Sequence, residues 1–344
     1  MSNSLRSLQA RLREVCLLSL ILAASACAGG YRVGPAPATF SRPTSGVSWI
    51  TPLAASDRVT LSRWRAAVGA PVVQPRLGAV SPAVDGLTVV SWNTALGYGD
   101  VTSLVAELRR AHPRRGIVLL LQEAFREDRD LPSSMSGLAF ASRIPCAPSD
   151  REIDSLGRSL DLSVYYVPSM RNGAPGTTYE DRGNAILSSL PLDELTAIEL
   201  PFERQRRVAV AASMRGLTSA GKEWTLRVAS AHLDNRSGIK KVWIGSEYAR
   251  TRQARGLLQA LEGDEPLVLG GDFNTWFGFA DAAFRETAQA FPQTIVTDRR
   301  RTFRGLMRLD HVFYRLPSGW QASVRRGESA LGSDHHPLIT EISF

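Results

Sequence analysis

Cysteine is scarce in this sequence. Only Cys16, Cys27 and Cys146 occur among the 344 residues, and we expect the first two to belong to an N-terminal leader and its processing site. Cys146 then has no partner for a disulfide. This scarcity excludes a disulfide-stapled scaffold, so a stable core has to come from the burial of apolar side chains.

Long apolar runs are lacking too, and the sequence shows no internal repeat and no coiled-coil pattern. The stretch from Val15 to Ala24 is too short for a comfortable membrane span, which needs about 20 apolar residues. Nothing later in the chain reaches the necessary length. We therefore expect a protein that is anchored to a membrane by lipid at most.

The first 27 residues have the composition of an export signal. Arg6, Arg11 and Arg13 precede the apolar stretch, and the small residues Ala-Ser-Ala-Cys follow it at 24–27. This end resembles a bacterial lipobox, in which the cysteine becomes the acylated first residue of the mature protein. We predict export to the periplasm or membrane anchoring through a lipid on Cys27. Cleavage without lipidation is one alternative, and an ordinary buried helix is another.

Residues 28–85 and residues 86–344 differ in composition. The first segment is rich in Gly, Ala, Pro and Ser, which predicts a tether with one short helix around Ser56–Ala67. Trp49 and Trp64 indicate that part of this tether docks on the domain, because aromatic side chains are rarely left wholly solvated. With 44% hydrophobic residues, the chain can bury one large core, and we predict one domain over 86–344.

Several predicted strands end in a polar residue that can bind a cation. Residues 87–92 lead to Asn93, and the buried strand pattern at 117–122 leads to Glu123. Later, Gly-Asp-Phe-Asn at 271–274 follows a third buried strand, and Gly-Ser-Asp-His-His at 332–336 opens the last apolar run. Carboxylates, amides and imidazoles at strand ends suit a site that holds a hard cation and attacks a phosphoester.

Three more polar residues lie between these motifs. Asn184 follows Arg-Gly, His232 lies near the end of the strand predicted from Trp224 to Leu233, and Asp310 begins another strand. Each has a plainer interpretation in isolation, as a structural histidine, a turn cap or a strand-terminating amide. The order of all these motifs along one chain favours a common site.

The ordered set from Asn93 to His335 resembles the endonuclease/exonuclease/phosphatase superfamily, which includes pancreatic-type deoxyribonuclease, apurinic endonucleases, bacterial sphingomyelinases and inositol polyphosphate 5-phosphatases. The resemblance covers about residues 87–344. It implies a four-layer α/β/β/α sandwich of two packed, mainly antiparallel sheets, with the site at one end. The residue pattern alone predicts mixed α/β, with helices at Val101–Ala111, capped by Asp100, and at Ser246–Leu261.

The resemblance also implies a set of metal ligands. Glu123 is the first choice as ligand of Mg²⁺, with Asn93 beside it and Asp334 joining from the other side. Mn²⁺ and Ca²⁺ suit oxygen ligands as well and remain open. Ala95 stands where apurinic endonucleases carry an acidic residue, which argues against a supplementary ligand and against a role in abasic-site repair.

The catalytic roles follow from the same resemblance. Asp272 would orient and deprotonate the attacking water, and Asn274 would hold the phosphate or that carboxylate. His335 would donate to a nonbridging phosphate oxygen while Asp310 keeps the imidazole aligned and protonated, because a carboxylate behind a histidine raises its pKa. His232 would contact phosphate or act as the general acid.

Positive charge bears on the substrate. The leader carries three arginines and one glutamate, so its removal lowers the formal net charge from +8 to +6. Basic residues cluster at two places, which are Arg299, Arg300, Arg301, Arg304 and Arg308, and Arg204, Arg206 and Arg207. Beside a phosphoester site they could steer a polyanion, and we predict Arg304 and Asn184 as substrate contacts. A solvated basic surface or attraction to anionic lipid headgroups is the alternative.

We predict an exported, monomeric, metal-dependent phosphoesterase that cleaves phosphodiesters in nucleic acid. A phosphatase or a sphingomyelinase-like phospholipid diesterase, acting on headgroups, is the second hypothesis. A noncatalytic binding lipoprotein that has kept the fold is the third.

Overall fold

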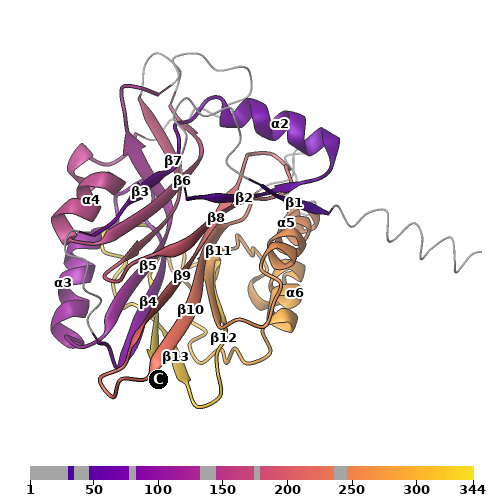
Figure 1. The fold of residues 1–344 in the computed structure, drawn as a ribbon. Helices are drawn as coiled ribbons and strands as arrows, with labels where there is room; N and C mark the ends of the chain where they lie inside the picture. The colour runs from indigo at the N-terminus through magenta and orange to yellow at the C-terminus, as the bar shows by residue number, and fades with distance from the viewer. Residues whose placement is uncertain (1–29, 35–45, 77–82, 132–144, 174–178, 236–245) are drawn as a thin grey trace, which may run out of the picture.

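The structure is a computed structural model that describes residues 30–34, 46–76, 83–131, 145–173, 179–235 and 246–344 (Figure 1). The predicted leader at 1–27, with Cys27, lies outside these residues, so export and lipidation stay predictions. None of the helices in the described part of the chain has the length and apolarity needed to cross a bilayer.

Two seven-stranded mixed sheets form the body of the described chain. Sheet A has the order β1 (Tyr31–Gly34), β2 (Ser48–Pro52), β8 (Asp193–Glu199), β9 (Val208–Leu217), β10 (Glu223–His232), β11 (Leu267–Asp272) and β12 (Asp310–Arg315). Sheet B has the order β13 (Gln321–Arg326), β14 (Leu338–Ser343), β4 (Gly86–Asn93), β5 (Gly116–Glu127), β7 (Glu180–Ser188), β6 (Ser163–Asn172) and β3 (Val72–Gln74). Only the pairs β2–β8, β10–β11 and β4–β5 are parallel.

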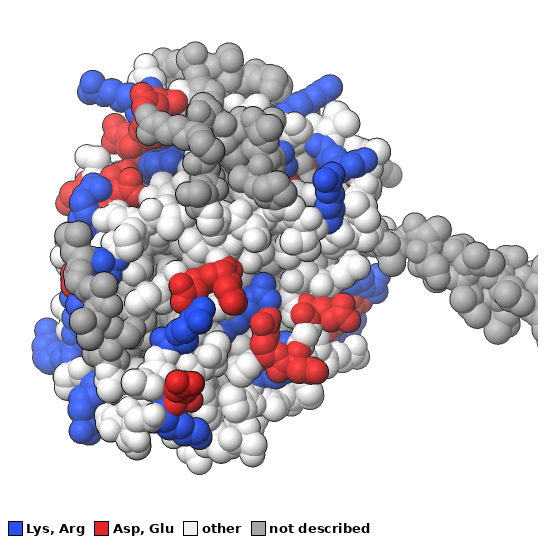
Figure 2. All heavy atoms as spheres, in the orientation of Figure 1, with Lys and Arg blue, Asp and Glu red and all other residues white. Residues whose placement is uncertain are grey.

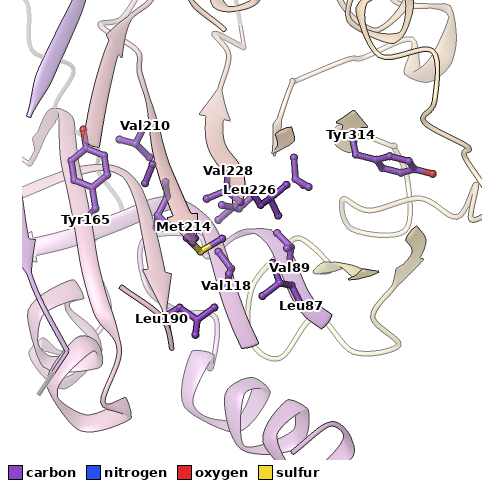
Figure 3. Close-up of a cluster of buried hydrophobic side chains, with 14 of the residues drawn as sticks. Leu87, Val89, Val118, Tyr165, Leu190, Val210, Met214, Leu226, Val228 and Tyr314 are labelled. Atoms are coloured by element: carbon purple, nitrogen blue, oxygen red, sulfur yellow. The ribbon is translucent and has the colours of Figure 1, made fainter. Parts of the chain in front are cut away.

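Helices cover the outer faces of both sheets and complete four layers. Sheet B carries α3 (Val101–Ala111) and α4 (Ile153–Leu160), whereas sheet A carries α5 (Ser246–Ala260) and α6 (Ala282–Ala290). The inner faces of the sheets enclose the largest apolar cluster, part of which Figure 3 shows. The strands read as near-continuous apolar runs because sheets between two layers bury both faces.

The four-layer α/β/β/α prediction is confirmed. Helix α3 has the predicted bounds, and the Asp100 side chain accepts a hydrogen bond from the main-chain N–H of Ser103 at 2.9 Å. Helix α5 ends one residue before the predicted bound. In both helices the apolar spacing marks the face that packs on a sheet.

The segment predicted as a tether contributes to both sheets. Strand β1 forms the edge of sheet A and pairs with β2, which pairs with β8, and β3 pairs with β6 at the edge of sheet B. Between them, α2 (Ala55–Arg65) occupies the region of the predicted short helix. Trp49 and Trp64 are buried. The described parts of residues 30–76 are therefore built into the folded body, which begins before residue 86.

Replacement of Trp49 tests this integration. We expect Trp49→Ala to lower the free energy of unfolding by about 3–5 kcal/mol, the usual cost of removing a large buried aromatic side chain. Urea unfolding measures it. The nearby Leu53 is 47% exposed, so Leu53→Ala should change stability by less than about 0.5 kcal/mol. Equal, small effects of both variants would show that the segment is a docked tether only.

Candidate active site

The register of three neighbouring strands brings three predicted site residues together. His232 ends β10, Asp272 ends β11 and Asp310 begins β12, and the pairing sets His232 opposite Asp272 and Asp272 opposite Asp310. All three side chains are buried. Because β10 and β11 run parallel while β12 runs antiparallel, two strand ends and one strand start meet at the same edge of sheet A.

Two glycines before Asp272 allow close approach of its neighbours. A Cβ on Gly271 would lie 2.1 Å from the carbonyl oxygen of Ala231 in β10, and a Cβ on Gly270 would lie 2.7 Å from the Cβ of Ser91 in sheet B. With the sheets this close, Asn93 at the end of β4 donates from Nδ2 to the Asp272 carboxylate at 3.0 Å. The Gly-Gly-Asp sequence thus joins the two sheets at the site.

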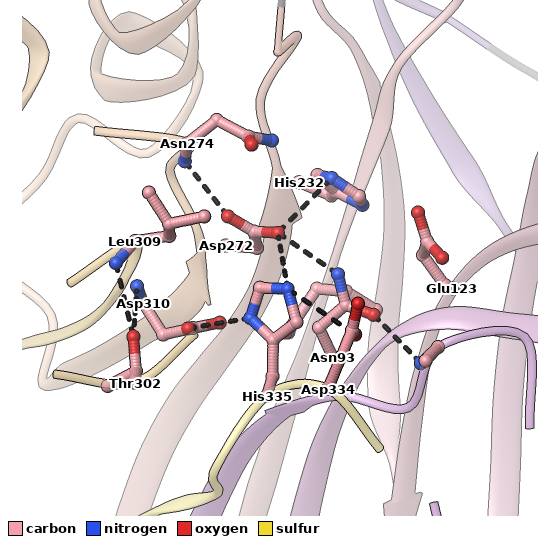
Figure 4. Close-up of polar contacts among 12 residues, drawn as sticks. Asn93, Glu123, His232, Asp272, Asn274, Thr302, Leu309, Asp310, Asp334 and His335 are labelled. Atoms are coloured by element: carbon pink, nitrogen blue, oxygen red, sulfur yellow. Dashed lines mark hydrogen bonds and ion pairs between the residues drawn. The ribbon is translucent and has the colours of Figure 1, made fainter. Parts of the chain in front are cut away.

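His335 lies against Asp310 and faces Asp272 (Figure 4). Its Nδ1 is 2.8 Å from Oδ2 of Asp310, and its Nε2 is 3.8 Å from Oδ2 of Asp272. The main chain is fixed as well, because the Trp92 indole donates to the His335 carbonyl at 2.9 Å and Ser333 Oγ accepts from the His335 N–H at 3.0 Å. The imidazole therefore has one orientation.

Burial and charge set the protonation of this group. Burial raises the pKa of Asp272 to about 7; the Asp310 carboxylate adds to the rise and the His335 imidazolium opposes it. Burial alone would lower the pKa of His335, but the carboxylates of Asp310 and Asp272 outweigh it and raise that pKa to about 10. Near neutral pH the site holds a protonated imidazole beside a carboxyl group that can accept a proton.

His232 has the opposite electrostatic environment. Its Nε2 lies 3.5 Å from Oδ2 of Asp272. Burial, the Arg207 guanidinium, the His335 imidazole and the Arg182 guanidinium lower the pKa of His232 well below its ordinary value. The ring is therefore neutral at physiological pH, which suits a hydrogen bond to phosphate better than proton donation.

Glu123 protrudes from a β-bulge in β5. The pairing with β7 shifts between Leu121 and Ala124, and Glu123 has a φ of 52°, in the left-handed region. A bulge re-aims a side chain, and such strained residues gather at functional sites. Asn274 also has a positive φ. Because Asn274 is not a glycine, its surrounding contacts must hold this left-handed backbone conformation.

The two predicted asparagine contacts differ in position. Asn274 lies two residues after Asp272, its N–H donates to the Asp272 carboxylate at 2.9 Å, and its Nδ2 donates to the Leu233 carbonyl at 3.0 Å. Asn184 lies on β7 and donates to the Val208 carbonyl at 2.7 Å. Asn274 thus orients Asp272, whereas Asn184 holds β7 to β9.

Asp334 and Arg304 bind each other at the edge of the site. Arg304 Nη2 lies 3.0 Å from Oδ2 of Asp334, while Oδ1 of Asp334 lies 3.9 Å from Nε2 of His335. Arg304, predicted as a substrate contact, therefore neutralises a residue predicted as a metal ligand. Asp334 is about one third exposed, so this ion pair is open to exchange with solvent.

The oxygen donors present fit a hard divalent cation. Oε1 of Glu123 lies 3.9 Å from Nη1 of Arg182, and Figure 4 shows Asn93 between Glu123 and Asp272. Oδ1 of Asp310 is buried without a hydrogen-bond partner. Among the described residues, one atom each of Asp272, Asp310 and His335 also lie within 4.8 Å of one another, but a protonated imidazole cannot bind a metal, so only the carboxylates of this group count as ligands. Magnesium needs only one or two such carboxylates.

Sequence reasoning missed Arg182 and Arg207 as site residues. With Glu123, Asn184 and His232 they line a small pocket, which Ser169, Met170 and Gly183 complete. Arg207 belongs to a basic run that we expected to steer a polyanion, with a solvated basic surface as the alternative, and Arg206 and Arg207 are both buried. The local sequence pattern does not indicate that Arg206 and Arg207 are buried, because their burial depends on the packing of β6 and β8.

The comparisons with known proteins identify the family. A model of the Endonuclease/Exonuclease/phosphatase family matches residues 90–335, and the chain belongs to this family. Its members are generally hydrolases of phosphoester bonds and typically use divalent metal ions. A search of curated proteins gave no match.

Similar solved structures are distant in sequence. An endonuclease/exonuclease/phosphatase from Beutenbergia cavernae has 16% identity and a TM-score of 0.53, with 76% of this chain and 72% of that chain covered. Sphingomyelinase C from Streptomyces griseocarneus has 18% identity and a TM-score of 0.45, with 76% and 99% covered. An AP endonuclease from Archaeoglobus fulgidus has 17% identity and a TM-score of 0.45, with 74% and 98% covered.

The protonation of His335 can be measured directly. We expect its imidazole NMR signals to stay those of the protonated ring up to a midpoint near pH 10. Asp310→Asn should move the midpoint to lower pH, because it removes a carboxylate that stabilises the imidazolium. Asp161→Asn, which removes a carboxylate paired with Arg76 instead, should not move it. A wild-type midpoint near the ordinary 6.5 would contradict this arrangement.

Proposed function

We propose that this protein is a divalent-metal-dependent phosphodiesterase that hydrolyses nucleic acid by in-line attack of water. The observation that carries the proposal is the buried alternation of carboxyl and imidazole groups in Asp310, His335 and Asp272, beside a pocket lined by the guanidinium groups of Arg182 and Arg207. Together these groups provide a proton acceptor, a proton donor and a binding site for an anion.

The pocket supports a phosphate as the ligand. Arg207 is 6% exposed, and no carboxylate among the described residues lies within ion-pair distance of it. The Nε atoms of Arg207 and Arg182 are buried and have no hydrogen-bond partner. Buried charges are normally paired, because burial of an isolated charge is costly. A phosphate would supply the missing charge and accept these hydrogen bonds.

The protein groups near the pocket divide the work of hydrolysis. Asp272, with a pKa raised to about 7, accepts the proton of the attacking water, and Asn93 and Asn274 hold its carboxylate in place. The protonated His335 donates to a phosphate oxygen as negative charge grows there. The neutral His232 contacts the phosphate.

Glu123, with Asn93 beside it, would hold the metal ion. When bound, a divalent cation neutralises phosphate charge and stabilises the leaving oxygen. Asp334 would join these ligands only after it leaves Arg304, so that the ion pair competes with metal binding at this position.

Basic residues outside the pocket favour a polyanionic substrate. Arg299 and Arg301 are exposed and have no carboxylate within ion-pair distance among the described residues, and Arg304 lies over the ring of Phe303, which contacts His335. On the face in Figure 2 the two charge signs are interspersed. Arg299 and Arg301, which have no ion-pair partner among the described residues, would attract neighbouring phosphates of a nucleic acid.

A phospholipid headgroup is the second candidate substrate. Phe277 is 56% exposed three residues after Asn274, and Leu306 is 64% exposed two residues after Arg304. Exposed apolar side chains close to a phosphoester site are suited to contact with a lipid surface. We also propose an exported monomer, attached to a membrane if Cys27 is lipidated.

Plasmid nicking tests the proposal. We expect the purified protein to nick supercoiled plasmid with Mg²⁺ and to stop when EDTA removes the metal. Asp272→Asn and His335→Ala should each lower kcat by about 10²–10⁴-fold, the usual contribution of a general acid or base. His336→Ala is the matched control, because His336 bonds the Gly327 carbonyl outside the group, and it should keep wild-type activity.

The other outcomes decide between the alternatives. Hydrolysis of sphingomyelin or inositol phosphates without nicking would contradict the nuclease and favour the second candidate. Turnover of no phosphoester, with binding unchanged in both variants, would contradict enzymatic function and favour a noncatalytic binding protein.

A further inference from the structure

Two buried ion-pair networks connect the N-terminal segment to the residues just before the pocket arginines. One network contains Arg206, the neighbour of Arg207, and the other contains Asp181, the neighbour of Arg182. Both reach residues of α2 or of the turn that follows it. The segment therefore contacts both chain stretches that carry the guanidinium groups of the pocket.

The first network is centred on Glu199 at the end of β8. Arg65, the last residue of α2, forms a two-point ion pair with its carboxylate, with Nε at 3.2 Å from Oε1. Arg206 Nε donates to the same Oε1 at 2.8 Å. Both guanidinium groups lie over the ring of Trp49, at 5.7 and 6.0 Å from its centroid. All four side chains are buried.

Arg206 also connects this network to the residues that line the pocket. Its Nη1 donates to the carbonyl oxygens of Pro168 at 2.8 Å and Ser169 at 3.2 Å. Ser169 lines the pocket, and its hydroxyl accepts from the N–H of Val208 at 3.2 Å. Arg207 lies between Arg206 and Val208, so its main chain is fixed on both sides.

The second network is centred on Asp181 in β7. Its carboxylate accepts from the N–H of Gly69 at 2.9 Å, from the Tyr166 hydroxyl at 2.8 Å and from Arg126. Arg126 also donates to the carbonyl of Ala70 at 2.8 Å. Successive side chains of a strand point to opposite faces. Asp181 points toward the N-terminal segment, so Arg182 points the other way, toward the pocket.

Stability alone is a poor reason for these buried charges. Buried ion pairs often stabilise a fold no better than apolar side chains of the same volume, because desolvation offsets the attraction. What they do provide is one defined geometry, since a misplaced buried charge is costly. The networks impose that geometry where two guanidinium groups must meet one anion.

We propose that residues 49–70 act as a brace, with Arg65 as a positioning residue that acts through Glu199 and Arg206 on Arg207. The inference rests on the proposed phosphate pocket. In this account the segment that the sequence presents as a tether is required for the pocket's affinity, although none of its residues contacts the substrate.

The test compares variants in the full chain. Arg65→Gln breaks the first network, and Asp57→Asn removes a different ion pair of α2, that with Arg252 of α5. Arg207→Gln removes a pocket guanidinium and serves as the reference for lost binding. For each protein we would measure urea unfolding, calorimetric affinity for inorganic phosphate, and kcat and KM for plasmid nicking.

We expect Arg65→Gln to weaken phosphate binding and to raise KM about tenfold, because a displaced guanidinium loses much of its contact with the anion. Asp57→Asn should lower the free energy of unfolding but leave phosphate affinity and KM unchanged. If Arg65→Gln does not fold, Glu199→Gln, which keeps the shape and removes the charge, should show the same rise in KM.

Two results would overturn the proposal, and they differ. Wild-type affinity for phosphate in a folded Arg65→Gln or Glu199→Gln variant, with only a loss of stability, would overturn the brace and leave the pocket intact. No phosphate binding by the wild type, or unchanged binding in Arg207→Gln, would overturn the pocket and the brace with it.

Discussion

The hydrogen bond between Asp310 and His335 is the interaction on which the site depends. Asp310 begins a strand of sheet A, and His335 lies in the loop that enters β14 of sheet B, so this 2.8 Å contact joins the two sheets at the end that carries the other polar side chains. It also fixes the charge of the imidazole. Without that positive charge, nothing would oppose the effects of burial and of the Asp310 carboxylate, and the pKa of Asp272 would rise further.

In the rest of the site, carboxylates alternate with positively charged or neutral rings and guanidinium groups. Asp272 lies between the imidazolium of His335 and the neutral ring of His232, and beyond His232 the pocket is positive through Arg182 and Arg207. A phosphate in the pocket would continue the alternation. The proposed brace belongs to the same scheme, because buried charges in a low dielectric must be held in place by neighbouring groups.

Much of this arrangement could be predicted from the sequence. The family resemblance carried by the order of the motifs implies the four-layer fold, and helix α3 follows from apolar periodicity and from the Asp100 cap. The placement of Asn93, His232, Asp272, Asp310 and His335 at strand ends or in the adjoining loop is local information, and the structure brings all five together.

What the sequence could not provide depends on long-range packing. The ion pair of Asp334 with Arg304 and the burial of Arg207 arise from chain segments far apart in the sequence. The segment at 28–85 reads as a tether because its short strands and its helix have weak local signals. Its role becomes visible only when β2 pairs with β8 and Arg65 reaches Glu199.

A double-mutant cycle between Asp310 and His335 tests the central claim most directly. The quantity is kcat/KM for plasmid nicking in Asp310→Asn, in His335→Gln and in the double variant. If Asp310 acts only through the imidazole, the double variant is no slower than His335→Gln alone. If the two losses multiply instead, Asp310 acts independently of His335, and the account of a carboxylate-held imidazolium is contradicted.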